Sequence, residues 1–475
     1  MMKNDAALSA RIHEWFISHT DAMLSDLCDL VSIRSVEGAP SGEMPYGEGP
    51  FNALMCARDI LTRLGFKTES FENRVLTADM NEKAPSLGIL AHLDVVEEGD
   101  GWKTDPFELS ISENGDMLYG RGVSDDKGPA IAAIYAMAAA RELAPALTKN
   151  CRILLGTAEE TGMDDLAHYA KANTYPPFVF SPDSDYPLIN TEKGRFLPSF
   201  SAEWEEDKDA LPRILSVTGG AVANIVPHLC SAEVEGLPLA LLRDSADAFA
   251  EKTGAVFTVS GTDERAEITV TGTASHGSLP ENGNNAQTAL LSLLASLPFA
   301  ETRGFEYIRA LSSLLPHGDW AGRAIGIAMQ DKLSGALTVN FGVFSYSPGK
   351  ISGTLDIRTP VCADESGLPE AMKTLFEGYG LSLDITAIKP SHHTSPDSPL
   401  VKTLLSIYED VTGEKGECLS VGGLTYAHSI DGAVAFGCRM PGKCCNMHAA
   451  NECIPLSDLL LSAEMFTRAI IEMCS

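Results

Sequence analysis

Along residues 6–190, the apolar positions switch repeatedly between the spacing of a helix and the spacing of a buried strand. Helices are predicted over 6–33, 51–66 and 129–143. Strands are predicted near 86–92, 107–111, 152–158 and 178–183, where short apolar runs end at polar residues. Strands that alternate with helices in this way predict an α/β sheet with helices on both faces.

The pattern changes beyond residue 183. From about 193 to 390 the chain holds strands that alternate polar and apolar residues, such as RAEITVTG and KISGTLDIRTP, together with glycine turns and helices. From about 395 to the end, helix and strand spacing alternate again. We therefore predict one α/β domain, formed by 1–192 and 393–475, that is interrupted by an inserted α+β domain over 193–392.

The composition narrows the class of protein. At 475 residues the chain exceeds what one hydrophobic core supports, and its apolar fraction of 44% is that of a soluble globular protein. The net charge of −30 argues against nucleic acid or an anionic membrane as a partner, since both bind basic patches.

No signal-peptide pattern opens the chain, and the most apolar stretches are shorter than the ~20 residues of a membrane span. Eleven cysteines, an odd number, fit reduced thiols, so we expect a cytoplasmic protein.

The first candidate site residue stands at the end of a strand. The run SLGILAHLDVV places His92 at the strand tip, and Asp94 follows two residues later on the same face. A metal-binding histidine is commonly held in this way, with one ring nitrogen on the metal and the other on a carboxylate. Taken alone, the pair would more often be a buried structural histidine or a surface turn.

Two acidic pairs follow. In LYGRGVSDDKGP, glycines allow a tight turn before a helix, so Asp125 and Asp126 lie in the preceding loop, where either would also suit a helix N-terminus. In ILLGTAEETG, a buried strand delivers Glu159 and Glu160 to its carboxyl end. Adjacent side chains there point in opposite directions, so one could bind a metal while the other acts as a general base.

Two further motifs complete the set of candidate metal ligands, FSPDSDYP and PGKCCNMHAANE. The first is a buried strand that ends at Asp183, with Asp185 as the alternative, and the second carries His448, which alone would more often be structural. The two histidines and the carboxylates lie at strand ends of one α/β domain, where such sheets bind ligands. Mixed imidazole and carboxylate ligands with one shared aspartate suit two divalent ions ~3.5–4 Å apart.

These motifs resemble those of the metallopeptidase family that includes carboxypeptidase G, aminoacylase and succinyl-diaminopimelate desuccinylase. The resemblance is carried by HLDVV, GRGVSDDKGP, the adjacent glutamates, PDSDYP and the late histidine. PYGEGP at 45–50, PDSDYPLINTEKG at 182–194 and GGLTYA at 422–427 narrow it to the PepV-type bacterial dipeptidases, near relatives of carnosinase, over nearly the whole chain. It implies a zinc-peptidase-like catalytic domain with an inserted lid domain of ferredoxin-like lobes, acting as a monomer.

The resemblance also implies a role for each site residue of the α/β domain. One ion would be held by His92, Asp125 and Asp183, and the other by Asp125, Glu160 and His448. Asp125 would therefore bridge the ions, which would be zinc, or else manganese or cobalt. Glu159 would be the general base, and Asp94 would orient His92.

Residues of the inserted domain are implied to act on the substrate. His276 in TASHGSLPENG would stabilise the oxyanion. Arg358 in LDIRTP would bind the C-terminal carboxylate of the substrate, and the alternative for it is an ordinary salt bridge within the sheet. The other substrate-binding residues that the resemblance implies are Asn224, Gly423 and Thr425.

Two features depart from the family pattern. His428 follows GGLTYA where relatives often have arginine, which leaves the preferred substrate side chains open. Cys444 and Cys445 lie unusually close to His448. Because they lack C-x-x-C spacing we interpret them as ordinary thiols, and the alternative is a role as soft metal ligands.

The implied reaction is the hydrolysis of the peptide bond of a short peptide, mainly a dipeptide. Glu159 would take a proton from the attacking water, and closure of the two domains would assemble the site and exclude bulk solvent. One alternative keeps the metals but acts on other substrates, as an N-acyl amino acid deacylase or a carboxypeptidase. A non-catalytic binding protein on an enzyme scaffold is disfavoured because all five ligands and the base are present.

Overall fold

The computed structural model describes residues 6–475 except 208, 365 and 444, and its chain divides into two compact units. Unit 1 comprises Met1–Thr191, His392–Leu419 and Leu424–Ser475. Unit 2 comprises Glu192–Ser391 and the short segment Ser420–Gly423. This short segment, predicted to lie in the first domain, groups with unit 2, where Lys193 N–H donates to the main-chain oxygen of Val421 (3.0 Å).

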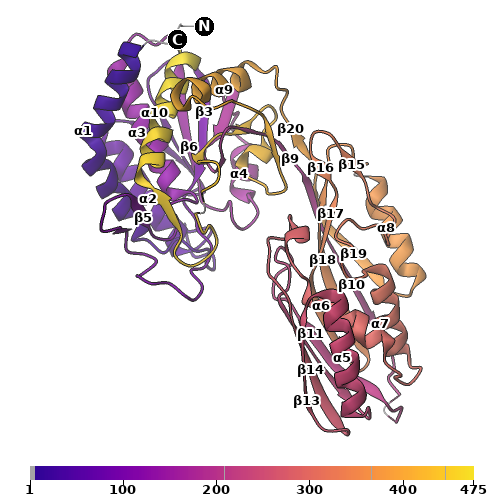
Figure 1. Ribbon diagram of the computed structural model, residues 1–475. Helices are drawn as coiled ribbons and strands as arrows, with labels where there is room; N and C mark the ends of the chain where they lie inside the picture. Colours follow the sequence, from indigo (N-terminus) through magenta and orange to yellow (C-terminus); the bar gives the residue numbers. More distant parts are fainter. Residues whose placement is uncertain (1–5, 208, 365, 444) are drawn as a thin grey trace. The chain divides into compact units, whose positions relative to one another are not determined.

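A nine-stranded sheet forms the centre of unit 1 (Figure 1). Its strand order is β1-β2-β6-β3-β7-β22-β9-β20, with β21 paired to β9. The strands are β1 Lys67–Phe71, β2 Val75–Asp79, β3 Pro85–His92, β6 Asn150–Gly156, β7 Phe178–Ser181, β9 Ile189–Glu192, β20 His392–His393, β21 Leu419–Val421 and β22 Val434–Ala435. Because β3 pairs in parallel with both β6 and β7, the carboxyl ends of these three strands meet at one edge of the sheet.

The central strands are apolar on both faces, as expected for parallel strands that are covered on each side. In β3, the residues from Leu87 to His92 are all buried. His92 lies opposite Gly156 of β6, and a side chain at position 156 would collide with the hydroxyl of Tyr426. The apolar run therefore carries a histidine into the interior beside a position that only glycine can occupy.

Six helices are described in unit 1: α1 Ala6–Val31, α2 Glu48–Arg63, α3 Lys127–Leu143, α4 Asp164–Tyr169, α9 Pro399–Thr412 and α10 Leu456–Met473. Helix α3 is alanine-rich and is buried from Lys127 to Ala140. It contacts α1, α10 and strand β3, and its small side chains allow this close packing. The start of α3 is thereby fixed next to the carboxyl end of β3.

Two small sheets tie the C-terminal part of the chain to loops near that edge. β24 (Cys453–Pro455) pairs with β5 (Met117–Tyr119), which also pairs with β4 (Ser110–Ile111). β23 (Cys438–Arg439) pairs with β8 (Ser184–Asp185). Residues 438–439 and 453–455 are therefore held beside the loops that follow β7 and β5.

Unit 2 contains an eight-stranded antiparallel sheet in the order β13-β14-β12-β11-β17-β18-β10-β19 (Figure 1). The strands are β10 Gly194–Glu203, β11 Arg213–Gly219, β12 Leu229–Glu235, β13 Val256–Gly261, β14 Arg265–Thr271, β17 Thr338–Ser347, β18 Lys350–Thr359 and β19 Ser382–Lys389. Helices α5 (Leu239–Thr253) and α6 (Ala286–Ser296) pack on one half of the sheet, and α7 (Arg303–Leu314) and α8 (Gly367–Gly378) pack on the other. Each half is therefore a four-stranded lobe with two helices.

The predicted fold class, an α/β domain with an inserted α+β domain, is confirmed by these two sheets. The strand predicted near 107–111 is reduced to the two residues of β4. Its beginning is taken up by a turn, because the side chain of Asp105 accepts a hydrogen bond from Phe107 N–H (2.9 Å) and its main-chain oxygen accepts one from Glu108 N–H (3.2 Å).

Candidate metal centre

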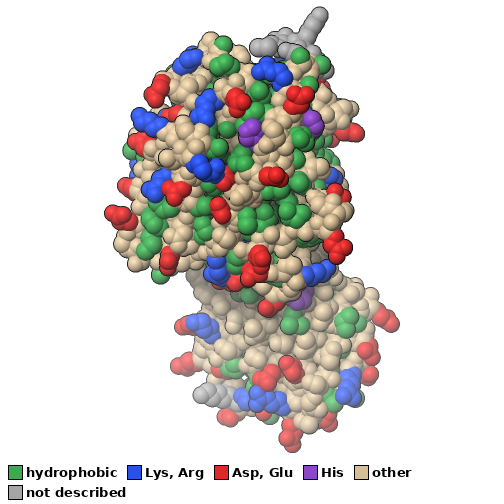
Figure 2. Space-filling view, turned by 90° about the vertical axis from the view of Figure 1, so that its left-hand side faces the viewer, with side chains coloured by type: hydrophobic (Ala, Val, Ile, Leu, Met, Phe, Trp, Pro, Cys, Tyr) green, Lys and Arg blue, Asp and Glu red, His purple; other side chains and the backbone are tan. Residues whose placement is uncertain are grey.

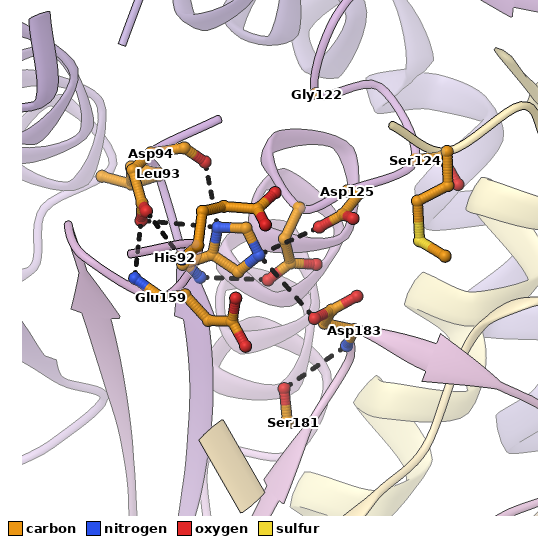
Figure 3. A network of polar contacts seen from close by, with 12 residues as sticks. His92, Leu93, Asp94, Gly122, Ser124, Asp125, Glu159, Ser181 and Asp183 are labelled. Carbon is orange, nitrogen blue, oxygen red and sulfur yellow. Dashed lines mark hydrogen bonds and ion pairs between the residues drawn. The ribbon is translucent and has the colours of Figure 1, made fainter. Parts of the chain in front are cut away.

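His92 stands at the carboxyl end of β3 and is 1% exposed. Its Nδ1 lies 3.0 Å from the main-chain oxygen of Asp94. A carbonyl oxygen only accepts hydrogen bonds, so Nδ1 carries the proton of the neutral ring and Nε2 presents a lone pair. Figure 3 shows Asp94 on one side of the ring and the carboxylates of Asp125 and Asp183 on the other.

Asp125 joins the two predicted metal-binding histidines. Its Oδ1 lies 3.0 Å from Nε2 of His92, and its Oδ2 lies 3.0 Å from Nε2 of His448. The residue is buried in the loop before α3, and Asp126 beside it accepts a hydrogen bond from His92 N–H (3.0 Å) instead of facing the second histidine. The carboxylate of Asp125 thus has one oxygen toward each imidazole, as a bridging ligand requires.

The other two predicted ligands lie on either side of this arrangement. Glu160 Oε1 is 3.2 Å from Nε2 of His448, and Asp183 Oδ2 is 3.7 Å from Nε2 of His92. The candidate ligand atoms of His92, Asp125 and Glu160 all lie within 4.8 Å of one another. The structure therefore brings all five predicted ligands together within unit 1.

The buried charge of this site fits a bound cation. Asp94, Asp125, Asp126, Glu159 and Asp183 are each at most 8% exposed. Within the described part of the chain, Oε1 of Glu159 has no hydrogen-bond partner. Burial raises the pKa of Glu159, and it raises the pKa of Glu160 to about 7. Unpaired buried carboxylates are costly, and divalent ions with imidazole and carboxylate ligands would neutralise them.

The histidine pKa values respond to the same excess of negative charge. Burial lowers the pKa of His448, but hydrogen bonds with Asp125 and Glu160 outweigh it and raise the pKa to about 11. The pKa of His92 is raised in the same way, against burial, by hydrogen bonds with Asp125, Asp183 and Asp94. The surrounding carboxylates thus favour positive charge at both imidazoles, and bound metal ions would balance the same negative charge.

The loop after β6, which carries Glu159 and Glu160, is held by two buried carboxylates. Asp94 accepts hydrogen bonds from the N–H groups of Glu159 (3.2 Å) and Glu160 (3.0 Å). Asp165 accepts hydrogen bonds from the N–H groups of Thr157 (2.8 Å) and Ala158 (3.1 Å). Four successive main-chain donors are therefore satisfied, which fixes the direction of both glutamate side chains.

Asp94 therefore differs in part from its predicted role. Its carboxylate is 3.5 Å from Nδ1 of His92, whereas its main-chain oxygen is at 3.0 Å. The carboxylate instead accepts the two N–H groups of the glutamate loop, because those donors have no strand partner beyond the end of β6. Asp94 holds the histidine with its backbone and the loop with its side chain.

Four further side chains hold the site and were not predicted from the sequence: those of Asp165, Tyr426, Arg121 and Glu452. The hydroxyl of Tyr426 donates to Asp165, and its ring packs edge-on against His92 at a centroid distance of 6.1 Å. Glu452, which is fully buried, accepts hydrogen bonds from Arg121 (2.8 Å) and from the N–H groups of Ser124 (2.9 Å) and Asp125 (3.1 Å). Glu452 lies four residues after His448, and this proximity is the signal that could have indicated it.

Arg439 contacts both aspartates of PDSDYP, and the two differ in how far they are buried. Its Nη1 donates to Oδ1 of Asp183 (3.2 Å), and its Nε donates to Oδ1 of Asp185 (3.0 Å). The side chain of Asp185 is 57% exposed and that of Asp183 is 11% exposed. Asp183 therefore lies between the guanidinium and His92, whereas Asp185 points to solvent.

Arg358 lies in unit 2, buried on β18. Its Nε and Nη2 donate to the two carboxylate oxygens of Asp356 (2.6 and 2.9 Å), and its Nη1 donates to the main-chain oxygen of Gly422 (2.6 Å). The salt bridge considered as the alternative is thus present. Arg195 lies opposite Arg358 on β10, and its Nη2 is 3.5 Å from Asp356. Two guanidiniums therefore share one buried carboxylate and leave a local excess of positive charge.

The remaining predicted substrate-binding residues fall in both units. Asn224 and His276 occupy neighbouring loops of unit 2, where Gly277 N–H donates to the main-chain oxygen of Asn224 (2.6 Å). Gly423 belongs to unit 2 and Thr425 to unit 1. The Thr425 hydroxyl accepts from Ala427 N–H (3.2 Å), so it caps a short helical turn. Cys444 lies outside the described residues.

Charged side chains of both signs are spread over the surface (Figure 2). On the face shown in Figure 2, lysine and arginine side chains are interspersed with aspartate and glutamate. Among the residues that the structure describes, every helix is too short or too polar to cross a bilayer.

Comparisons with known proteins place this geometry in context. The model of Peptidase family M20/M25/M40 matches residues 88–472. A beta-Ala-Xaa dipeptidase of Lactobacillus delbrueckii subsp. lactis is 34% identical over 458 residues, which cover 95% of this chain and 96% of that protein.

Two solved structures share the fold at low sequence identity. Human carnosine dipeptidase 1 matches with a TM-score of 0.63 and 15% identity, covering 98% of this chain and 99% of that one. The metallo-carboxypeptidase Sso-CP2 of Sulfolobus solfataricus matches with a TM-score of 0.59 and 18% identity, covering 95% of this chain and 99% of that one. The fold therefore occurs both in a dipeptidase and in a carboxypeptidase.

Proposed function

This chain belongs to Peptidase family M20/M25/M40, a metal-dependent family, and we propose that it is a dipeptidase that hydrolyses the peptide bond of short peptides. The near full-length similarity to a beta-Ala-Xaa dipeptidase supports this substrate class. The shared fold alone does not choose between a dipeptidase and a carboxypeptidase, because it occurs in both.

The observation that carries the proposal is the position of Asp125 between two histidines. Each of its oxygens is 3.0 Å from a different Nε2 atom. The first ion would be held by His92, Asp125 and Asp183, and the second by Asp125, Glu160 and His448. When bound, two such ions polarise the scissile carbonyl and lower the pKa of water toward neutrality. We favour zinc for these ligands, with manganese or cobalt as alternatives.

Glu159 is the residue that we propose to move the proton. Its Oε1 has no hydrogen-bond partner among the described residues, so it is available to a water molecule. Burial raises the pKa of Glu159, which brings it closer to the working pH of a general base. Glu159 would take a proton from the attacking water and then pass it to the nitrogen of the leaving amine.

The inserted unit would contribute two contacts with the substrate. Arg358 would bind the C-terminal carboxylate, since each Nη atom has a second N–H and together these could hold a carboxylate bidentately. His276 would donate a hydrogen bond to the developing oxyanion. A contact that requires the C-terminal carboxylate would favour dipeptides over longer chains.

The experiment is a substrate panel on metal-reconstituted enzyme. Metal-free protein is loaded with zinc, manganese or cobalt and assayed on dipeptides, tripeptides and N-acetyl amino acids, with Glu159→Gln loaded in parallel as a matched control. The proposal expects dipeptides to give the highest kcat/KM. Preferred hydrolysis of N-acetyl amino acids would identify a deacylase instead, and near-normal turnover by the Glu159→Gln control would contradict the proposed role of Glu159.

The proposal also includes a monomeric enzyme of the cytoplasm. The odd number of cysteines supports an environment in which thiols stay reduced. Two related lobes in unit 2 would remove the need for a second subunit. Light scattering after size-exclusion chromatography measures the mass, and a dimer would contradict this part of the proposal.

A further inference from the structure

His276 lies on a well-fixed loop of unit 2. Strand β14 ends at Thr271, and the loop beyond it pairs with the segment that carries Asn224. Val226 N–H donates to the main-chain oxygen of Ser275 (2.8 Å), and Gly277 N–H donates to that of Asn224 (2.6 Å). The backbone on both sides of His276 is therefore anchored, although its side chain is exposed.

Ser278 contacts the near nitrogen of the His276 ring. The main-chain N–H of Ser278 donates to Nδ1 of His276 (3.2 Å), and the Ser278 hydroxyl lies 2.6 Å from the same atom. A backbone amide can only donate, so Nδ1 must present its lone pair. In a neutral imidazole the proton then resides on Nε2, the nitrogen farthest from the backbone.

From this geometry we propose that Ser278 is a positioning residue that holds His276 as the neutral tautomer with its proton on Nε2. His276 then offers an N–H donor to an oxyanion, and it is excluded from acting as a base through that nitrogen. The opposite tautomer would present a lone pair to the oxyanion and a ring N–H to the Ser278 amide, and both contacts are repulsive. The inference rests on the proposed function, in which His276 stabilises the oxyanion.

Ser278 is itself held in place by Gly422. Ser278 is 5% exposed, and a Cβ atom at position 422 would lie 2.8 Å from its Cβ and 3.2 Å from its Oγ. Glycine is therefore required for this approach. The main-chain oxygen of Gly422 also accepts the hydrogen bond from Nη1 of Arg358 (2.6 Å). Gly422 thus contacts both the residue that sets the His276 tautomer and the proposed carboxylate-binding arginine.

The direct test is nitrogen NMR of the imidazole rings. Long-range proton–nitrogen correlation on the metal-loaded full chain, labelled with ¹⁵N-histidine, distinguishes a protonated from an unprotonated ring nitrogen, and the His276→Gln spectrum assigns the signals. We expect an unprotonated Nδ1 and a protonated Nε2 at neutral pH. A protonated Nδ1 in the wild-type protein would overturn the proposal without reference to activity.

Two pairs of variants connect the tautomer to catalysis. The amide nitrogen of glutamine reaches about as far as Nε2, whereas that of asparagine reaches about as far as Nδ1. His276→Gln is therefore expected to retain at least about ten times the kcat of His276→Asn, since loss of one oxyanion donor costs roughly 100-fold. Equal kcat for the two variants, or a higher kcat for asparagine, would overturn the inference.

Ser278→Ala removes the hydroxyl but keeps the amide donor, and Ser278→Thr restores a hydroxyl. We expect alanine to lower kcat by about 3- to 10-fold, the effect of one hydrogen bond, with KM nearly unchanged and with a detectable shift of the His276 nitrogen signals. Threonine should recover both. A changed KM with unchanged nitrogen signals would indicate a merely structural role. If the wild-type protein shows the expected tautomer but hydrolyses no dipeptide, the proposed function fails and the tautomer assignment stands.

Discussion

Replacement of Glu452 by glutamine is expected to loosen the loop that carries Asp125. The carboxylate of Glu452 is fully buried and faces the guanidinium of Arg121, whose side chain is 1% exposed, at 2.8 Å. It also accepts N–H groups of Gly122 (3.1 Å), Ser124 (2.9 Å) and Asp125 (3.1 Å). Glutamine keeps the shape of the side chain but loses its charge. Its NH2 group cannot accept a hydrogen bond, so some of these N–H donors would lose their acceptor.

The size of the effect follows from the burial of the pair. Loss of one partner of a buried ion pair typically costs about 3–5 kcal/mol, because the other charge is left unpaired. An Arg121→Met background already leaves the Glu452 carboxylate unpaired, so Glu452→Gln removes that buried charge there and should cost only about 1 kcal/mol or less. Because the loop carries the proposed bridging ligand, we also expect metal affinity to fall about 10- to 100-fold in the single variant.

The assay is urea unfolding of the metal-free protein, observed in unit 1 alone. Replacement of Trp204 and Trp320 by phenylalanine leaves Trp15 and Trp102, both in unit 1, as the fluorescent reporters. Chelator competition measures the metal affinity of the same variants. The reasoning would be refuted if Glu452→Gln cost less than ~0.5 kcal/mol, or if its cost were equal in the two backgrounds.

Four other predictions concern the proposed general base, the hydrogen bond between Tyr426 and Asp165, the stability of unit 2 and the proposed contact of Arg358 with the substrate. Glu159→Gln should keep its metal by elemental analysis and lose kcat by about 10²- to 10⁴-fold; near-normal turnover would contradict its role as the base. Tyr426→Phe removes a hydrogen bond to the Asp165 carboxylate and should lower the free energy of unfolding of unit 1, measured in urea, by about 2 kcal/mol. A loss below ~0.5 kcal/mol would show that the contact is unimportant. Burial lowers the pKa of His317, so the folded state binds fewer protons than the unfolded chain as the pH falls through ~6.5. The thermal stability of unit 2 should therefore decline on acidification. The decline should be less steep in His317→Gln. Arg358→Ala should raise KM for dipeptides with a free carboxylate far more than for amidated ones, and equal effects on both would argue for the salt bridge alone.

The sequence indicated candidate ligands because several of them follow strands that end at one edge of the sheet, and the family resemblance implied the set of five. Apolar runs that stop at His92, Glu159 and Asp183 bring their last residues to the same edge of the sheet. The choice of Asp125 over Asp126 came only from the family pattern, and the structure supplies the physical reason. Asp126 is engaged with the main-chain N–H of His92, which leaves Asp125 to face both imidazoles.

The residues that hold the site could not be predicted from local pattern. Glu452 and Asp125 are 327 positions apart, and Tyr426 and Asp165 are 261 positions apart. Each contact exists only once the sheet has formed, and neither residue interrupts the periodicity of its own segment. Ser278 lies two residues from His276, yet its contact with Nδ1 depends on the conformation of the loop, which composition does not reveal.

The proposed metal centre depends most on one carboxylate, that of Asp125, being shared by two metal ions. Anomalous diffraction from zinc-soaked crystals, recorded on both sides of the zinc absorption edge, measures this directly. The account predicts two anomalous peaks about 3.5–4 Å apart, one near His92 and the other near His448, with Asp125 between them. A single peak, or two peaks without Asp125 between them, would contradict it.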